Sequence, residues 1–289
     1  MRLVYTLLLT AAVAATTAYL VRPEGSAPGA ATTQESAFER VLRTGVLRCG
    51  YNVWAPSVLV DPTTGKLTGI VPDLVEKMAA AAKIKVEWTE QIGWSEFPAA
   101  LNSGRIDAFC AGSWQTEDLA SLVAFTQPVF YSPIYAYIRS DETRFGQDYA
   151  KLNQPFVRFA TTDGAMSDLV PMQSFPKAQR VSRPALADPA TELLDVAFNK
   201  ADVVMTVPGY LAAYERQNPG KVKRLNNIPY RTFATPLVAV AMGEHNLVQM
   251  LNTLATELTL QGEVEKTVAR YVGRNGIVLL PKMPYQIQP

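Results

Sequence analysis

Strand and helix patterns alternate along the first part of this chain, and this alternation limits the fold more than any other feature. Strands are predicted at residues 45–50, 84–88 and 106–110, each bounded by glycine or polar residues. A helix with apolar side chains at helical spacing is predicted at residues 72–82, and a second helix at residues 94–102 ends at a Ser-Gly pair. This order is typical of a largely parallel α/β lobe.

A second series of the same kind follows. Residues 129–139 are extended and aromatic in pattern and are suitable for a strand that leaves the first lobe. Strands predicted at residues 157–160 and 202–207 then alternate with helices predicted at residues 191–199 and 209–217. The second half therefore predicts another α/β lobe.

The chain is expected to return to the first lobe near its end. Residues 237–242 are predicted to form a strand that goes back, and amphipathic helices follow it. We therefore expect lobe 1 to consist of residues 36–138 and 236–289, and lobe 2 of residues 139–235. The chain would cross twice between the lobes.

The N-terminus carries an apolar run at residues 3–21 between two arginines, a pattern typical of an export signal. Small residues at positions 16–18 and 29–31 would allow cleavage, but a run of this length can also span a bilayer of about 30 Å. Both a periplasmic protein and one tethered to the inner membrane remain open. Residues 1–35 are assigned to a signal peptide or membrane anchor with a flexible linker, and membrane contact is expected only there.

Composition excludes several classes of function. The 289 residues are 48% hydrophobic, which is enough to bury a substantial core and argues against disorder. Lys and Arg total 27 against 26 Asp and Glu, and no basic tract is interleaved with aromatic residues. Binding to nucleic acid is therefore not expected.

Several motifs fall in a recognisable order. RIDA at residues 105–108 and VAFTQP at residues 123–128 flank TEDL at residues 116–119. Together with segments elsewhere, they resemble family 3 extracytoplasmic solute-binding proteins over residues 40–273. The other segments that carry the resemblance are LRTGVLR at 42–48, WAP at 54–56, GKLTG at 65–69, TTDG at 161–164, ADVV at 201–204 and ARYVG at 269–273.

The resemblance implies a periplasmic-binding-protein-like α/β fold of type II. Such a fold has two lobes with mostly parallel sheets, two hinge crossings and a cleft that closes on a small molecule. Ligands in open parallel sheets sit at the carboxyl ends of the strands.

Two residues that form ion pairs with the ligand in this family are missing here. The arginine that binds a ligand carboxylate in the family falls on Leu119, and the acidic residue that binds an ammonium falls on Val207, or on Thr206 if the alignment slips by one. Leucine cannot replace a bidentate arginine contact. The resemblance therefore predicts a ligand other than a standard amino acid.

The set of aromatic residues that contacts the ligand in this family is larger here instead. The resemblance brings Trp54, Trp94 and Trp114 to one cleft, which would suit an aromatic, apolar or cationic ligand. From lobe 2 it brings Thr162, Asp163 and Gly164, with Asp163 as a counter-charge for a cation.

Each of these residues also has a structural interpretation. Tryptophans are most often core residues. The TTDG segment could be a plain helix cap, in which Thr or Asp accepts backbone N–H bonds. Ser113, Gln115 and Thr116 could donate to a ligand or satisfy the turn in which they lie.

The chain has two cysteines, Cys49 and Cys110, at the ends of predicted strands. In the fold that the resemblance implies, those strands are neighbours, and export would permit a bridge. Neighbouring parallel strands seldom give the geometry of a disulfide, so two buried thiols are favoured.

These features favour an exported solute-binding protein that serves an ABC-type importer. One alternative is an anchored sensor or accessory that binds a protein partner on the same fold. A dehydratase-like enzyme is a further alternative, and it would need a carboxylate and a substrate-binding cation in the cleft. Catalytic residues, a cofactor and a metal site are not expected, since His245 is the single histidine and the cysteines lack metal-ligand spacing.

Overall fold

The structure is a computed structural model that describes residues 35–273 and 277–281. The chain divides into residues 1–36 and residues 37–289, and the second unit carries the helices and strands named below. The apolar run at residues 3–21, on which cleavage or anchoring depends, lies outside the described residues. Within the described ranges, no helix is both long and apolar enough to cross a membrane.

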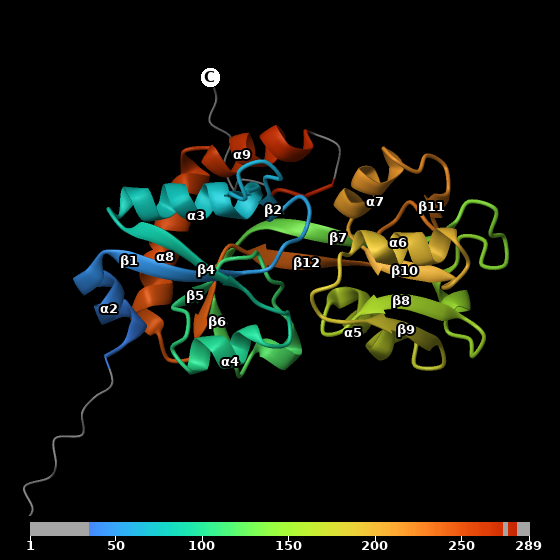
Figure 1. Ribbon diagram of the computed structural model, residues 1–289, viewed down its shortest axis with the longest axis horizontal. Helices are drawn as coiled ribbons and strands as arrows, with labels where there is room; N and C mark the ends of the chain where they lie inside the picture. Colours follow the sequence, from blue (N-terminus) through green and yellow to red (C-terminus); the bar gives the residue numbers. More distant parts are fainter. Residues whose placement is uncertain (1–34, 274–276, 282–289) are drawn as a thin grey trace, which may run out of the picture. The chain divides into compact units, whose positions relative to one another are not determined.

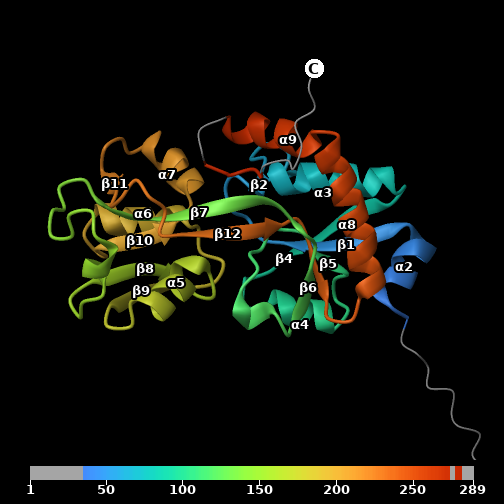
Figure 2. The ribbon, with the colours of Figure 1, turned by 180° about the vertical axis from the view of Figure 1, so that it is seen from behind.

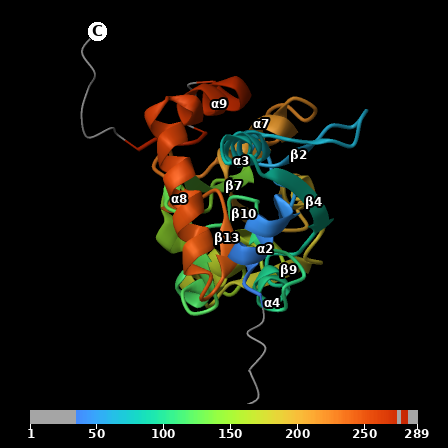
Figure 3. The same cartoon turned by 90° about the vertical axis from the view of Figure 1, so that its left-hand side faces the viewer.

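Lobe 1 is built on a sheet with the strand order β4-β1-β5-β13-β6 (Figure 1). β1 runs parallel to β4 and β5, whereas β13 runs antiparallel to β5 and β6. Figure 3 shows α3 and α4 on opposite sides of this lobe. The elements are α2 (Ala37–Thr44), β1 (Val46–Tyr51), β2 (Leu59–Val60), β3 (Leu67–Thr68), α3 (Ile70–Ala81), β4 (Lys85–Gln91), α4 (Phe97–Asn102), β5 (Ala108–Phe109), the 3₁₀ helix η1 (Glu117–Leu119), β6 (Val123–Phe125), β13 (Ala239–Ala241), α8 (His245–Leu260) and α9 (Glu263–Val272).

Lobe 2 is built on a sheet with the order β11-β7-β10-β8-β9. β8 runs parallel to β9 and β10, while β7 runs antiparallel to β10 and β11. Three neighbouring strands of each sheet are therefore parallel, β4-β1-β5 in lobe 1 and β10-β8-β9 in lobe 2, and the remaining pairings are antiparallel. The elements are β7 (Pro128–Arg139), the 3₁₀ helix η2 (Tyr149–Leu152), β8 (Arg158–Thr162), α5 (Met166–Ser174), β9 (Gln179–Arg183), α6 (Ala190–Ala197), β10 (Val203–Thr206), α7 (Pro208–Glu215), β11 (Val222–Arg224) and β12 (Arg231–Pro236).

Two strands, β7 and β12, join the lobes. β7 leaves lobe 1, and β12 returns beside it in antiparallel register, with Ile134 opposite Arg231 and Phe130 opposite Thr235 (Figure 2). The predicted two-lobe α/β fold with two crossings is confirmed. The predicted limit at residue 138 falls within the lobe 2 sheet, where Ile138 in β7 pairs with Val203 of β10, and the limit at residue 236 falls at the last residue of β12.

The spacing of apolar residues in helix α3 predicts which side chains are buried. Leu74, Val75 and Met78 are fully buried, as their helical spacing predicts. The helix follows Gly69, whose φ is 118°, and a Cβ there would lie 2.6 Å from the carbonyl oxygen of Ser57. A side chain is therefore excluded at this turn.

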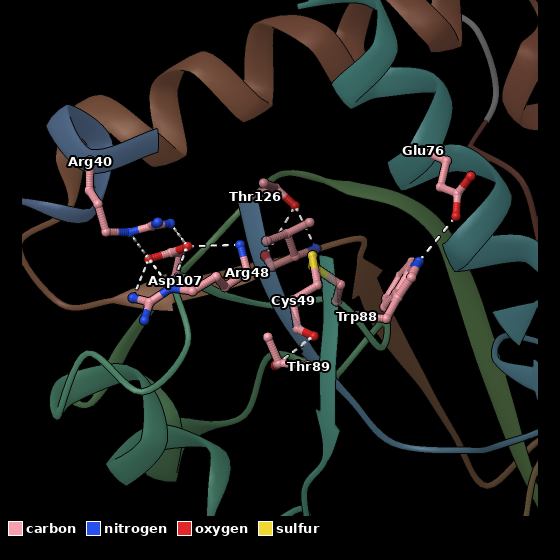
Figure 4. The surroundings of a disulfide bond; sticks show 10 residues. Arg40, Arg48, Cys49, Glu76, Trp88, Thr89, Asp107 and Thr126 are labelled. Carbon is pink, nitrogen blue, oxygen red and sulfur yellow. Dashed lines mark hydrogen bonds and ion pairs between the residues drawn. A yellow bond between two sulfur atoms is a disulfide. The ribbon is translucent and has the colours of Figure 1, made fainter. Parts of the chain in front are cut away.

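Each lobe contains a buried aspartate paired with arginine. Asp107, just before β5, accepts hydrogen bonds from the backbone N–H and the Nη2 of Arg48 in β1, each at 2.8 Å, and also pairs with Arg40 (Figure 4). Asp202, just before β10, accepts from the backbone N–H of Arg158 in β8 at 2.9 Å and from its Nε at 3.0 Å. The two lobes thus repeat one local arrangement that fixes neighbouring parallel strands.

The expectation of two buried thiols is wrong, because Cys49 and Cys110 form a disulfide (Figure 4). Their Cα atoms are 5.6 Å apart, within the range of ordinary bridges. Cys49 is paired in register with Ala108, and Cys110 follows the end of β5. The geometric objection applies to residues inside a regular parallel ladder, and Cys110 lies just outside it.

Removing this disulfide should lower the free energy of unfolding by about 4 kcal/mol, because the bridge restricts the unfolded chain. The bridged residues are 61 positions apart. Urea unfolding of the Cys49→Ala/Cys110→Ala variant measures the loss, and wild type under reducing conditions should lose a similar amount. The double variant should not respond to reductant. An unchanged wild-type midpoint after complete reduction would contradict the bridge.

Candidate functional site

A cavity of about 260 Å³ lies between the two lobes. On lobe 1 it is bounded by the loop after β1, the turn before α4 and the loop after β5. On lobe 2 it is bounded by the segment between β8 and α5, the first turn of α6 and the end of β10. It therefore occupies the carboxyl ends of parallel strands, where open α/β sheets bind ligands.

All of the predicted site residues except Asp163 line this cavity. Asp163 is exposed, and its carboxylate accepts a hydrogen bond from the hydroxyl of Ser182. Its position therefore gives no support to a counter-charge role. A ligand contact by the others stays a prediction. The lining residues from the predicted set are Trp54, Trp94, Ser113, Trp114, Thr116, Leu119, Thr162, Gly164, Thr206 and Val207.

The three tryptophans pack on one another. The ring of Trp54 meets Trp94 edge to face at 6.3 Å between centroids, and meets Trp114 in the same way at 5.7 Å. Trp114 in turn stacks on Phe233 at 4.9 Å. Trp54 is buried, and its indole N–H donates to the carbonyl of Ala111. Trp54 is thus as much a core residue as a cavity residue, while the half-buried Trp94 and Trp114 are more accessible to a ligand.

Buried polar atoms on the lobe 1 wall have no hydrogen-bond partner within the part of the chain that the structure describes. They are Asn52 Nδ2, Ser113 Oγ, Trp114 Nε1 and Thr116 Oγ1. Gln115, by contrast, donates to the carbonyl of Thr126 and so satisfies the loop. Buried polar groups normally have partners, and those that lack one are candidates to bond a ligand.

Glu192 is a cavity residue that the sequence analysis missed. It lies in the first turn of α6, is 2% exposed, and lines the cavity from lobe 2. Its Oε1 accepts hydrogen bonds from the hydroxyls of Thr162 at 2.6 Å and Ser167 at 2.7 Å. Thr162 therefore bonds Glu192 through its side chain. Burial raises the pKa of Glu192 to about 7, although these hydrogen bonds act to lower it.

The sequence held only a weak sign of this role. An acidic residue in the first turn of a helix ordinarily stabilises the helix dipole, and such residues are exposed as a rule. Nothing in the spacing of residues 190–197 indicates that Glu192 faces a cavity.

The charged residues that line the cavity are both acidic. Glu192 lies inside, and the exposed Asp118 lies on the lobe 1 side next to Leu119. Among the described residues that form the wall, none is lysine or arginine. Nor does any group of three or more His, Cys, Asp or Glu within residues 35–273 and 277–281 have the arrangement of a metal site. The electrostatics of the wall thus favour a neutral or cationic ligand over an anionic one.

Residues 47–274 match the family described as bacterial extracellular solute-binding proteins, family 3. The chain belongs to this family. A relative from Neisseria gonorrhoeae, named "Probable histidine-binding protein", is 27% identical over 225 residues, which cover 77% of this chain and 81% of the relative.

Solved structures of binding proteins have the same fold as this family member. An ancestral amino acid-binding protein, described as a precursor of cyclohexadienyl dehydratase, is 21% identical with a TM-score of 0.71, and the match covers 82% of this chain and 99% of that one. A cysteine-binding protein from Campylobacter jejuni is 17% identical with a TM-score of 0.73, and the match covers 86% of this chain and 100% of that one.

In this solute-binding protein, Gly209 and Gly164 are among the glycines at which the lobes meet closely. A Cβ on Gly209, at the start of α7, would lie 2.7 Å from Pro56 Cδ and 2.9 Å from the carbonyl oxygen of Ala55. A Cβ on Gly164 would lie 3.0 Å from the Cβ of Ser95. Both contacts join lobe 2 to lobe 1 beside the cavity. Larger side chains there would hold the lobes apart.

The Glu192→Gln variant should be more stable than wild type above neutral pH. The folded wild type keeps a proton on Glu192 between the ordinary pKa of 4.5 and about 7, so its stability falls as pH rises through this window. Glutamine avoids this loss, which amounts to about 3 kcal/mol at pH 8 and less than about 1 kcal/mol at pH 5. Urea unfolding at both pH values measures it. The exposed Glu215→Gln variant should show no such gain, and equal stability of Glu192→Gln and wild type at pH 8 would contradict the buried carboxylate.

The Gly209→Val variant should keep both lobes folded but lose their close approach. Its side chain would displace Pro56 and the Ala55 carbonyl, so the radius of gyration from small-angle X-ray scattering should exceed that of wild type. Ala212→Val is the control, because Ala212 is exposed on the same helix. A radius equal to the wild-type value would argue against this lobe contact in solution.

Proposed function

We propose that this protein is exported, captures a small molecule in the cavity between its lobes, and delivers it to an ABC-type importer. The ligand has an aromatic or apolar body and is not a standard amino acid. The observation that carries the proposal is the composition of the wall. Tryptophan rings and unpartnered polar atoms on lobe 1 share one cavity with a buried carboxylate on lobe 2.

The absence of a cation from the described wall argues against an ordinary amino acid. Among the described wall residues a ligand carboxylate would meet neutral donors but no guanidinium or ammonium, and neutral donors compensate a buried anion less than a charged partner does. Leu119 stands where family members are expected to have arginine, and the Neisseria relative is named for histidine. We therefore infer that this chain has diverged from such relatives in ligand rather than in fold.

Export is proposed from the apolar run at residues 3–21 together with membership in an extracellular family. A periplasmic form and a form tethered to the inner membrane both agree with delivery to an importer there. Sequencing the N-terminus of the mature protein distinguishes the two.

The alternatives have less support. An anchored sensor or accessory would be favoured by a cleft filled with its own side chains, whereas this cavity measures about 260 Å³. A dehydratase-like enzyme would need a carboxylate and a substrate-binding cation together. Glu192 could supply the carboxylate, but the described lining offers no lysine or arginine for the second role.

Ligand capture should change tryptophan fluorescence and raise Tm. A panel of amino acids, aromatic acids, aromatic amines and quaternary amines is screened by thermal shift, and a bound compound should raise Tm by several degrees at saturation. The fluorescence change should be reduced in Trp114→Phe, whose ring lines the cavity.

Trp88→Phe is the matched control. Trp88 lies in β4, donates to Glu76 at 3.1 Å, and is not part of the cavity wall. Its loss should leave the ligand-induced change intact. No thermal or fluorescence response to any compound in a broad metabolite panel would refute small-molecule capture.

A further inference from the structure

Glu192 has one carboxylate oxygen engaged and one available. Both of its hydrogen bonds, from Thr162 and Ser167, end on Oε1. No described residue donates to Oε2. The two hydroxyls come from the end of β8 and the first turn of α5, so the carboxylate is held from one side by rigid elements. A buried acceptor in a fixed position at a cavity wall is well placed to accept a hydrogen bond from a ligand.

The cation near Glu192 is already paired, and the neighbouring tyrosine is uncharged. Arg183 on β9 is the nearby cation, but Asp195 on α6 engages its Nε at 2.7 Å. From α7, Tyr210 lies within electrostatic reach of Glu192 and of Asp188, and burial raises its pKa well above the usual value, so it stays neutral. The cavity side of Glu192 therefore lacks a compensating cation from the described residues.

We propose that Glu192 is a specificity-determining residue, whose free oxygen accepts a hydrogen bond from an N–H cation on a ligand that lacks a carboxylate. This inference rests on the proposed function and names the chemical class of its ligand: an amine with an aromatic or apolar body. The amine is directed to lobe 2, and the body lies against Trp94 and Trp114 of lobe 1. Glu192 thus takes the role that the sequence had suggested for Asp163.

This assignment predicts that ligand binding releases a proton from Glu192. The apo protein holds Glu192 half protonated near pH 7, and an arriving ammonium requires the carboxylate. Binding therefore releases the proton of Glu192 to buffer. Affinity should be about tenfold lower at pH 6 than at pH 8, because an amine with an ordinary pKa stays charged throughout this range.

Calorimetric titration with matched probes tests the assignment. The probes are 2-phenylethylamine, the neutral 2-phenylethanol, and phenylalanine, which adds a carboxylate. The amine should bind the wild-type protein at least tenfold more tightly than 2-phenylethanol or phenylalanine does. At pH 7, buffers of different ionisation enthalpy should reveal release of about half a proton per amine bound.

Variants separate a binding role from a structural one. Glu192→Gln keeps an oxygen acceptor for Thr162 and Ser167, so it should fold, yet lose amine affinity at least thirtyfold, along with the proton release and the pH dependence. Glu215→Gln, exposed on α7, should behave like wild type.

The outcomes distinguish the two proposals. If the alcohol binds as tightly as the amine, or if Glu192→Gln keeps amine affinity, the assignment of Glu192 is wrong while solute capture stands. If the compound that the thermal screen identifies carries no cationic nitrogen, the assignment is equally wrong. If neither these probes nor any screened compound binds, the proposed function itself fails.

Discussion

The antiparallel pairing of β7 with β12 is the constraint on which the rest of the site depends. Both strands run between the lobes, so the chain returns to lobe 1 along the line by which it left (Figure 2). The cavity is consequently lined by residues far apart in sequence, such as Trp54 and Glu192. Two strands connect the lobes, and the cavity walls approach each other at small residues beside the cavity. At Gly209 an added Cβ would lie nearer to the opposite lobe than at Gly164.

Glu192 introduces a local conflict between stability and binding. A carboxylate that is 2% exposed, and that bonds hydroxyls alone among the described residues, is poorly compensated, because the neighbouring guanidinium of Arg183 is held by Asp195. Core residues around it, such as Leu193 and Val196, are fully buried and hold the helix in place. Binding sites often keep destabilising groups of this kind, since an uncompensated group interacts most strongly with a complementary ligand.

The sequence predicted the two-lobe fold because the periodicity of strands and helices is local, and Leu74 and Met78 are buried as that periodicity requires. It did not predict that Glu192 lines the cavity, nor that Asp163 is absent from the lining. Thr162 is the last residue of β8 and bonds Glu192, whereas Asp163 begins the turn that follows and bonds Ser182 on β9. The disulfide was missed for a similar reason, because it depends on where β5 ends, and strand ends are poorly marked in sequence.

Leu119 and Glu192 have to be considered together. On the proposed assignment, the cavity carries one buried negative charge and no basic side chain from the described wall to balance it. A zwitterion would satisfy Glu192 with its ammonium but leave its own carboxylate against leucine, and a neutral ligand would leave Glu192 to keep its proton. A monocation alone balances the charge, because it supplies one positive group and buries no second negative one. On this proposal, Leu119 disfavours ligands that carry a carboxylate and Glu192 favours ligands that carry a cation, so the two positions on opposite lobes select the ligand together.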